Sequence, residues 1–438
     1  MKCVVFVPGT MGTSLSTPQG EEVWPPKASE VIFGYHRKDK LLQDNLVVGD
    51  IVRRVSCFDV YKPIVETLAA IGFKETGAGD RLHIFAYDWR RDLEQLADKL
   101  AAEIEAVAAA GPTSITIVAH SMGGLIGRLV LESGKFSAKP WFAKIKGLMT
   151  LGTPHLGAPL ALARILGLDG DMGISPADFK AIAADQRYPS GYQLLPAPGE
   201  AACWDIKAGG TLGVLDIYDA ATAGALGLDA VLVDRARWVH DTLRNGTVPA
   251  HIRYFYFAGT GHETATRVNV ATSSKVMTRQ QDTGDGTVPL WSALPKSGQK
   301  QLVVGEHSKF FTETNFKAVF FRLFGKSFPA PPTTVAGVLS ATLSVQALTL
   351  RKTDTVELLV IPIEPADKIK GNIVLERTEA PETPFAKVGK AIEVAYAGPP
   401  TPSLKLNLPP IGKPGAYRIR FEGEPTVAAP VMFAITDT

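Results

Sequence analysis

The sequence predicts an α/β domain with a parallel sheet covered on both faces, followed by a smaller all-β domain. Short apolar segments alternate with amphipathic helical patterns from residue 3 to about residue 151, which is typical of a parallel sheet with helical crossovers. Prolines then gather at 327–332, and the segments that follow are short and strand-like. We therefore expect one domain at 1–328 and a second at 329–438.

Length and composition agree with two globular domains. The chain has 438 residues, of which 45% are hydrophobic and 21% are charged. The 46 Lys and Arg nearly balance the 44 Asp and Glu, and this net charge of +2 argues against a nucleic-acid partner. No run of about 18 apolar residues could form a transmembrane segment. The three cysteines are far apart and lack metal-type spacing, so we expect neither a metal nor a cofactor.

The N-terminus predicts a strand and no leader. The first ten residues, M-K-C-V-V-F-V-P-G-T, carry one lysine and a short apolar run that ends at a Pro-Gly turn. This run is too short for a signal peptide and is typical of the first strand of a fold. We therefore expect a protein that is cytoplasmic or exported without a cleaved leader.

The spacing of apolar residues predicts the elements of the α/β domain in order. The clearest helix begins at Asp92, carries apolar residues at spacings of 3, 4, 4 and 3, and ends at Gly111-Pro112. Between about 156 and 250 the alternation is lost, which predicts a cap inserted over the sheet. The expected strands are 3–7, 82–86, 114–119, 145–151, 253–258 and 301–304, and the other expected helices are 58–71, 122–131 and 310–323.

The C-terminal domain is predicted to be an antiparallel, immunoglobulin-like β-sandwich. About seven short strands with turn signals fill about 105 residues. The expected strands are 339–350, 355–363, 371–376, 391–397, 403–408, 416–421 and 431–435. This part of the chain contains no histidine and no cysteine, so we expect the chemistry to lie upstream.

A serine at the junction of a strand and a helix is the candidate nucleophile. Residues 118–124 read V-A-H-S-M-G-G, with an apolar strand before them and a helical pattern after them. The nucleophile elbow G-x-S-x-G needs small residues beside the serine because the turn is tight. Ala119 replaces the first glycine, and Gly123 and Gly124 supply the far side. This context predicts that Ser121 stands exposed above the sheet.

A serine nucleophile needs a base and an acid, which follow it in the order acid, then histidine, in folds with this elbow. Of the eight histidines, His307 lies in the loop between the last predicted strand and the last helix, where the base is expected. His262 follows a strand, but no acid stands between it and the cap. The loop Q-D-T-G-D-G-T-V-P offers Asp282 and Asp285, and the glycines beside Asp285 favour it.

An oxyanion site needs two backbone N–H groups directed at the developing negative charge. The amide of Met122, directly after the nucleophile, is one candidate. The loop V-P-G-T-M-G-T at 7–13 follows the first strand, and the amide of Thr10 is the second candidate.

Seven motifs follow one another along the chain: V-P-G-T-M-G, A-Y-D-W-R, A-H-S-M-G-G, L-G-T-P-H-L-G, P-S-G-Y-Q-L-L-P, G-D-G-T-V-P and G-E-H-S. In this order they resemble the lecithin:cholesterol acyltransferase and lysosomal phospholipase family, over about residues 1–325. The resemblance implies an α/β-hydrolase fold with an inserted cap and a mobile lid at about 14–55. It also implies a Ser121, Asp285 and His307 triad with oxyanion amides at Thr10 and Met122. Two features depart from the family: no cysteine lies between residues 13 and 56, and the C-terminal sandwich is additional.

The expected activity is that of a serine ester hydrolase or acyltransferase acting on lipid-like acyl esters through an acyl-enzyme. The alternatives are a carboxylesterase or polyester hydrolase on other esters, and a non-catalytic lipid-binding protein. Trp24 and Phe33 lie in apolar stretches of the lid, which would either cover the substrate and contact a membrane or lipid aggregate, or pack internally. His155, after the strand that follows the elbow, is expected to line or support the site.

Overall fold

The computed structural model describes residues 1–438 except 56–57, 208–211, 330–339, 379–382, 428 and 438. Its centre is a six-stranded sheet in the order β15-β12-β9-β8-β1-β7, and every pair in it is parallel. The predicted parallel sheet is therefore confirmed. Its strands are β1 (Lys2–Val7), β7 (Arg81–Ile84), β8 (Ser114–His120), β9 (Ile145–Leu151), β12 (Arg253–Thr260) and β15 (Gln299–Val304).

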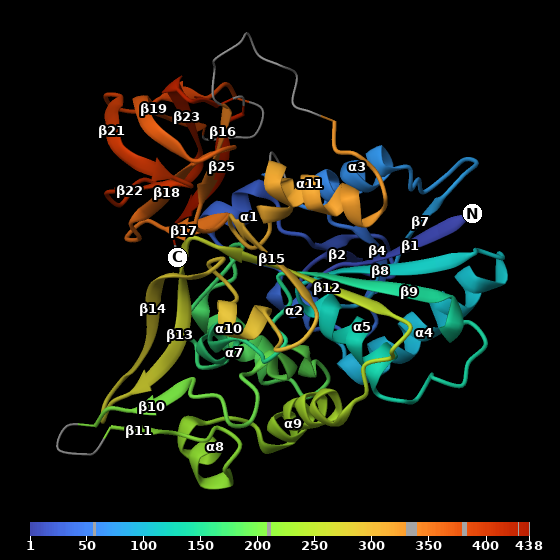
Figure 1. Ribbon diagram of the computed structural model, residues 1–438. Helices are drawn as coiled ribbons and strands as arrows, with labels where there is room; N and C mark the ends of the chain where they lie inside the picture. Colours follow the sequence, from blue (N-terminus) through green and yellow to red (C-terminus); the bar gives the residue numbers. More distant parts are fainter. Residues whose placement is uncertain (56–57, 208–211, 330–339, 379–382, 428, 438) are drawn as a thin grey trace.

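Helices cover both faces of this sheet (Figure 1). Alternate residues of β1 show the two faces, because Val5 packs in one apolar core and Phe6 in the other. A continuous apolar run such as C-V-V-F-V at residues 3–7 is what a strand buried on both faces requires. One face carries α4 (Leu93–Ala109), α5 (Met122–Glu132) and α9 (Ala230–Asn245); the other carries α3 (Lys62–Ile71) and α11 (Thr314–Leu323).

Two predicted helices differ from the structure at their starts. The helix expected from residue 58 begins at Lys62, because β6 (Phe58–Asp59) pairs with β5 (Arg54–Val55). The helix expected at 310–323 is split into the 3-10 turn η3 (Phe310–Thr312) and α11. Two further short elements lie outside the cap and the lid, the 3-10 turn η1 (Phe142–Lys144) and α10 (Leu290–Ala293).

The cap and the lid cover the carboxyl ends of the central strands. The hairpin of β13 (His262–Val270) and β14 (Lys275–Gly284) joins the cap in a four-stranded sheet, β11-β10-β13-β14, so the cap extends beyond the predicted end near 250. The other cap elements are α6 (Pro159–Ile165), α7 (Pro176–Ala183), η2 (Pro189–Leu194), β10 (Cys203–Asp205), β11 (Gly213–Val214) and α8 (Ala220–Leu226). The lid contains β2 (Thr13–Ser16), β3 (Glu22–Trp24), α1 (Ala28–Phe33), α2 (Lys38–Leu41) and β4 (Val47–Ile51).

The C-terminal domain consists of two sheets around one apolar core. One sheet has the order β22-β18-β16-β24, and the other has β17-β25-β23-β19-β20 with β21 beside β19. The predicted single strand at 339–350 divides into one strand in each sheet, so the chain crosses between sheets at 346–348. The strands are β16 (Ser340–Val345), β17 (Thr349–Arg351), β18 (Val356–Pro362), β19 (Ala366–Thr378), β20 (Ala386–Lys387), β21 (Ile392–Thr401), β22 (Leu404–Leu408), β23 (Gly415–Glu424), β24 (Thr426–Val427) and β25 (Val431–Thr436).

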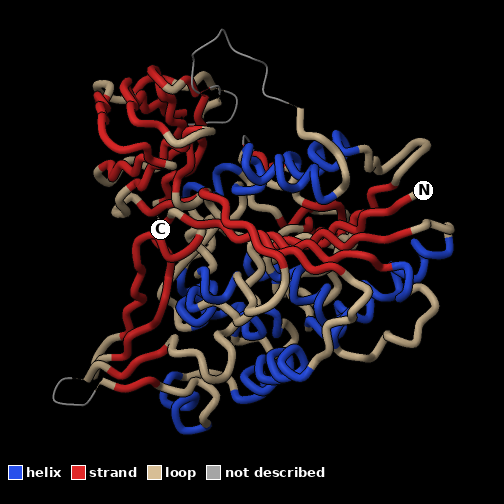
Figure 2. The backbone as a smooth tube through the Cα atoms, in the orientation of Figure 1, coloured by secondary structure: helices blue, strands red, loops and turns tan. Residues whose placement is uncertain are grey.

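The expectation of a purely antiparallel sandwich is wrong at two pairs, because β16 pairs with β24 and β17 with β25 in parallel. This follows from the crossover, which carries the first segment from one sheet to the other. The predicted domain boundary, between residues 328 and 329, lies directly before residues 330–339, which are outside the described residues. Figure 2 shows that the sandwich lies beside the ends of the central strands that the cap also covers. Within the described residues, no helix combines the length and apolarity needed to cross a membrane.

Candidate active site

Ser121 occupies a strained turn between β8 and α5. Its backbone φ is 52° and ψ is −127°, a conformation that costs a non-glycine residue energy and is typical of functional sites. The glycines after it have no room for a side chain. A Cβ on Gly123 would lie 2.4 Å from the Pro8 carbonyl oxygen, and one on Gly124 would lie 2.0 Å from Thr153 Oγ1. The small residues predicted from the elbow motif are thus required by the packing of neighbouring loops.

His307 and Asp285 meet Ser121 from two separate loops. The Ser121 Oγ lies 3.0 Å from His307 Nε2, and His307 Nδ1 lies 2.8 Å from Asp285 Oδ2. The Asp285 side chain is fully buried, and its other oxygen accepts the N–H groups of Thr287 and Val288. We call Ser121, His307 and Asp285 the nucleophile cluster. It has the contacts that a serine, a general base and an orienting acid require.

The carboxylate of Asp285 stabilises the protonated form of His307. Burial by itself would lower the pKa of His307, but the charge and hydrogen bond of Asp285 raise it above the ordinary histidine value. The alternative acid, Asp282, points away from the site and pairs with Lys405 of the sandwich. The structure therefore brings Asp285, and not Asp282, to the histidine.

A buried polar chain that the sequence did not predict links this histidine to the 7–13 loop. The Tyr61 hydroxyl accepts the Gly9 N–H at 2.8 Å and lies 2.8 Å from His120 Nδ1. His120 Nε2 lies 3.1 Å from the His307 carbonyl oxygen, to which it donates. Burial holds the pKa of His120 well below the ordinary value, so its neutral Nδ1 accepts from Tyr61. The sequence contains a signal for His120, the neighbour of the nucleophile, and none for Tyr61.

The 7–13 loop places Thr10 against Met122. Thr10 Oγ1 lies 3.3 Å from Met122 Sδ, and the Gly12 N–H donates to the Gly9 carbonyl oxygen at 3.1 Å, which closes a tight turn around Thr10. Among the described residues, neither the Thr10 nor the Met122 backbone N–H has an acceptor. Thr10 lines the cavity beside Ser121, and Met122 directly follows Ser121 at the start of α5, so both amides lie next to the serine.

The cavity beside the nucleophile cluster has a volume of about 580 Å³. Its wall includes Ser121 and His307, Trp24 from the lid, Phe179 from the cap and Leu348 from the sandwich. Trp24 is 1% exposed and its indole donates to the Met11 carbonyl oxygen at 2.7 Å. Trp24 thus combines the two alternatives drawn from the sequence, since it packs internally and also faces the cavity.

Phe33 and His155, which the sequence predicted as substrate-binding residues, are not among the residues that line this cavity. Phe33 ends α1 and is 58% exposed to solvent. His155 is buried, with Nε2 3.2 Å from Thr150 Oγ1 and its ring edge-on to Tyr256. Burial lowers the pKa of His155 well below the ordinary value. Its position in the loop after β9 directs the ring into the core, so it supports the loop and does not face this cavity.

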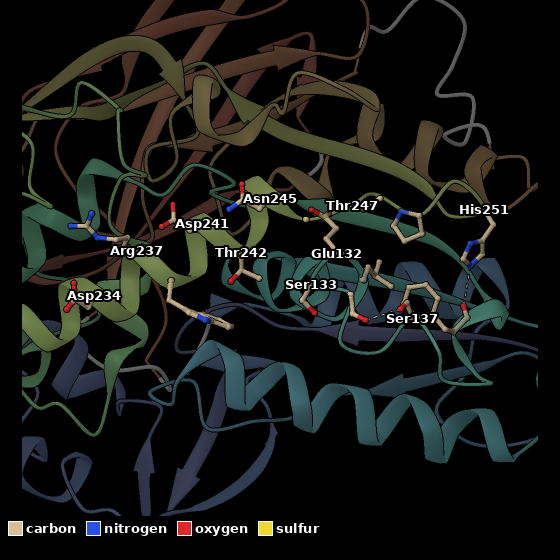
Figure 3. A pocket seen from close by; sticks show the side chains of 16 residues that line it. Glu132, Ser133, Ser137, Asp234, Arg237, Asp241, Thr242, Asn245, Thr247 and His251 are labelled. Atoms are coloured by element: carbon tan, nitrogen blue, oxygen red, sulfur yellow. Dashed lines mark hydrogen bonds between the residues drawn. The ribbon is translucent and has the colours of Figure 1, made fainter.

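A second hollow lies away from this site, between the end of α5 and α9 (Figure 3). It is an open groove of about 1030 Å³, and its lining includes Glu132, Asp241 and His251. Glu132 is paired with Arg128 at 2.7 Å, and His251 Nε2 contacts the Phe142 carbonyl oxygen. None of the site residues predicted from the sequence lines this groove.

A second serine–histidine–carboxylate cluster joins the two domains. His262 on β13 lies 2.8 Å from Ser344 Oγ through Nε2 and 2.8 Å from Glu357 Oε1 through Nδ1. The acid that the sequence did not find for His262 comes from the sandwich. We call His262, Ser344 and Glu357 the interface cluster. Among the described residues, no group of three His, Cys, Asp or Glu side chains is placed to hold a metal.

Comparison with known proteins agrees with this architecture. Residues 52–223 match the family model described as lecithin:cholesterol acyltransferase. A curated relative, lecithin-cholesterol acyltransferase-like 4 from Arabidopsis thaliana, is 32% identical over 143 residues, which cover 31% of this chain. The matched region covers 24% of that relative, so the chain spans about a quarter of its length.

Among solved structures, a chain of the Tle4-Tli4 complex aligns with a TM-score of 0.52 and 13% identity, over 74% of this chain and 97% of that chain. The Bacillus licheniformis lipase BlEst2 in its mature form aligns with a TM-score of 0.39 and 13% identity, over 73% of this chain and 91% of that one. At such identity the first likeness concerns the fold alone. The chain thus has an α/β-hydrolase fold and, over residues 52–223, is similar to the lecithin:cholesterol acyltransferase family.

Proposed function

We propose that this protein is a serine ester hydrolase that acts on lipid-like acyl esters through an acyl-enzyme. One observation carries the proposal. The Ser121 Oγ lies 3.0 Å from a histidine that a buried carboxylate holds at 2.8 Å, and this serine opens onto a cavity beside two free amides. A nucleophile, a base, an acid and an oxyanion site are the parts that acyl transfer needs.

The reaction follows from the positions of these groups. His307 Nε2 takes the proton of Ser121 as the Oγ attacks the ester carbonyl carbon. The amides of Thr10 and Met122 stabilise the oxyanion, and Asp285 stabilises the imidazolium. His307 then gives its proton to the leaving alcohol as the carbon–oxygen bond breaks, which leaves an acyl group on Ser121. Water, or a second alcohol, attacks this acyl-enzyme with His307 again as base, and the acid or the new ester is released.

The walls of the cavity favour an acyl chain over a polar substrate. Side chains from the 7–13 loop, the cap and the sandwich contribute apolar surface next to the nucleophile, including Met11, Leu160 and Phe179. The family match, and the name of the plant relative, favour lipid esters and leave transfer to an alcohol open. Contact with a lipid surface would involve Phe33, which is exposed on the lid, and not Trp24, which is buried.

A panel of p-nitrophenyl esters of rising chain length, run beside phospholipid vesicles, tests the proposal. We expect hydrolysis that increases with chain length, release of fatty acid from vesicles, and labelling of Ser121 by a phosphonate. Activity confined to acetate and butyrate would favour the carboxylesterase or polyester alternative. Absence of both turnover and labelling would leave a non-catalytic lipid-binding protein.

The exposed lid residue Phe33 allows a test of whether the protein contacts a lipid surface. Phe33→Ala should lower turnover on vesicles more than on soluble esters, because its ring lies outside the cavity and in solvent. An equal effect on both substrates would exclude lipid contact through Phe33.

A further inference from the structure

The crossover between the two sheets of the sandwich, residues 346–348, forms part of the wall of the cavity beside Ser121. In Figure 1 this corner of the sandwich lies at β17, beside the ends of the central strands. The C-terminal domain, expected from its sequence to hold no chemistry, therefore reaches the site through its backbone and its apolar side chains.

This wall rests directly on the loop that holds the acid. Gly286, the residue after Asp285, has a φ of 91°, and a Cβ on it would lie 2.3 Å from the Gln346 carbonyl oxygen. Glycine is needed at this position both for the backbone conformation and for the approach of the sandwich. The sandwich and the acid loop are thus in van der Waals contact without an intervening side chain.

The other end of the wall is fixed to the cap. Thr349 Oγ1 donates to Asp171 Oδ1 at 2.9 Å and accepts the Met172 N–H at 3.4 Å. The Leu348 carbonyl oxygen accepts the Ala434 N–H at 2.8 Å, which holds the crossover against β25. A wall held at both ends keeps its shape when a ligand binds, as a specificity-determining surface must.

Leu348, an apolar residue of the crossover, packs against the main core cluster and also lines the cavity. Half-buried apolar side chains of the 7–13 loop, the segment before α3, the cap and the sandwich pack on one core cluster and also line the cavity. Surface of this kind gains stability when an apolar ligand covers it. The set comprises Met11, Val60, Met172, Phe179, Leu194 and Leu348.

We propose that the sandwich is part of the acyl-binding site, and that Leu348 contacts the acyl chain of the bound ester and sets the chain length that fits. The proposal rests on the proposed function, because an acyl chain enters this cavity only if its ester carbonyl reaches Ser121. The sandwich then acts as a specificity element of the catalytic site in addition to its own fold.

Two substitutions that change the side-chain volume of the crossover in opposite directions test this role. Leu348→Ala removes apolar contact, so kcat/KM for long-chain p-nitrophenyl esters, relative to acetate, should fall about tenfold, mainly through KM. Ala347→Leu, in the same crossover, fills the cavity and should shift the preferred chain length downward. Ile392→Ala is the matched control, because Ile392 is an exposed apolar residue of the same domain outside the cavity lining.

The outcomes separate this inference from the proposed function. If the wild type neither hydrolyses any ester nor reacts with a phosphonate, the proposed function fails. If the wild type is active and both crossover variants melt normally but keep its chain-length profile, the inference alone is overturned. A profile changed as strongly by Ile392→Ala would also overturn it, since the effect would then not come from the wall. Should one variant fail to fold, the other decides.

Discussion

The nucleophile cluster and the interface cluster have nearly the same internal geometry and different settings. Both contain a serine, a histidine and a carboxylate joined by contacts of 2.8 to 3.0 Å. In the interface cluster, however, Ser344 lies within a strand, is 5% exposed, and its Oγ also accepts the Glu306 N–H at 3.3 Å. Ser344 does not line the cavity of about 580 Å³.

The comparison shows that hydrogen-bond geometry alone does not make a nucleophile. Ser121 has what Ser344 lacks: a strained turn between a strand and a helix, a cavity in front of it, and two neighbouring amides that we propose bind the oxyanion. The interface cluster instead holds the domains together, since Glu357 also contacts Lys405 at 3.3 Å and accepts the Glu263 N–H. The following predictions test this difference.

The largest effect is expected at the two serines. Ser121→Ala should lower kcat by about 10⁴-fold or more, because no acyl-enzyme can form. Ser344→Ala should keep kcat within about tenfold and should keep phosphonate labelling. Ester turnover and intact-protein mass after labelling measure both variants. Labelling of Ser121→Ala at another serine would show that the clusters have been assigned the wrong way round.

The carboxylates should differ by nearly as much. Asp285→Asn should lower kcat by about 10³–10⁴-fold, since His307 loses its orienting acceptor. Asp282→Asn removes an exposed pair with Lys405 and should cost less than about tenfold. Steady-state kinetics at one pH compare the two. A greater loss in Asp282→Asn would mean that the acid loop changes its conformation when substrate binds.

The amide of Thr10, which we propose stabilises the oxyanion, lies beside the nucleophile cluster and has no counterpart in our account of the interface cluster. Thr10→Pro deletes the backbone N–H and should lower kcat by about 10²–10³-fold. Thr10→Ala keeps the N–H and should stay within about tenfold. A melting curve must show that the loop tolerates proline. If the alanine variant were as inactive as the proline variant, the Thr10 hydroxyl and not the amide would be essential.

The pH dependence of turnover depends on the charge of Asp285. His307 acts as base only when neutral, and its pKa is raised above the ordinary histidine value. Activity should therefore be full at alkaline pH and fall as pH decreases through that raised pKa. In Asp285→Asn the raising charge is absent, so the midpoint of the residual activity should move to lower pH. An unchanged midpoint would show that the titration of His307 does not control the rate.

The smallest effect on catalysis is expected at the interface cluster, where stability should change instead. Burial raises the pKa of Glu357, but its contacts with His262 and Lys405 outweigh this and lower it below the ordinary value. The carboxylate therefore adds stability above the unfolded-state pKa, and this stability is lost as pH falls through the lowered folded pKa. Glu357→Gln should lose about 1–3 kcal/mol at neutral pH and less in acid, as measured by denaturant unfolding. An unchanged pH dependence would show that the charge is not needed.

The sequence by itself predicted the sheet, the elbow and the candidate residues around it. Apolar runs such as 3–7 are read directly from the chain, because a strand buried on both faces has no other composition. The order of Ser121, Asp285 and His307 follows from motifs that adjoin their strands. The single expected strand at 339–350, by contrast, divides between two sheets, and no local pattern marks the crossover.

The tertiary structure alone decided which residues meet. Phe33 and His155 sit in suitable motifs but point to solvent and into the core, because packing and not composition sets the direction of a side chain. Glu357 reaches His262 across 95 positions of the chain, and Leu348 reaches the cavity only because the sandwich docks on Gly286. Contacts between domains depend on surfaces that form after each domain has folded, so no spacing within the sequence encodes them.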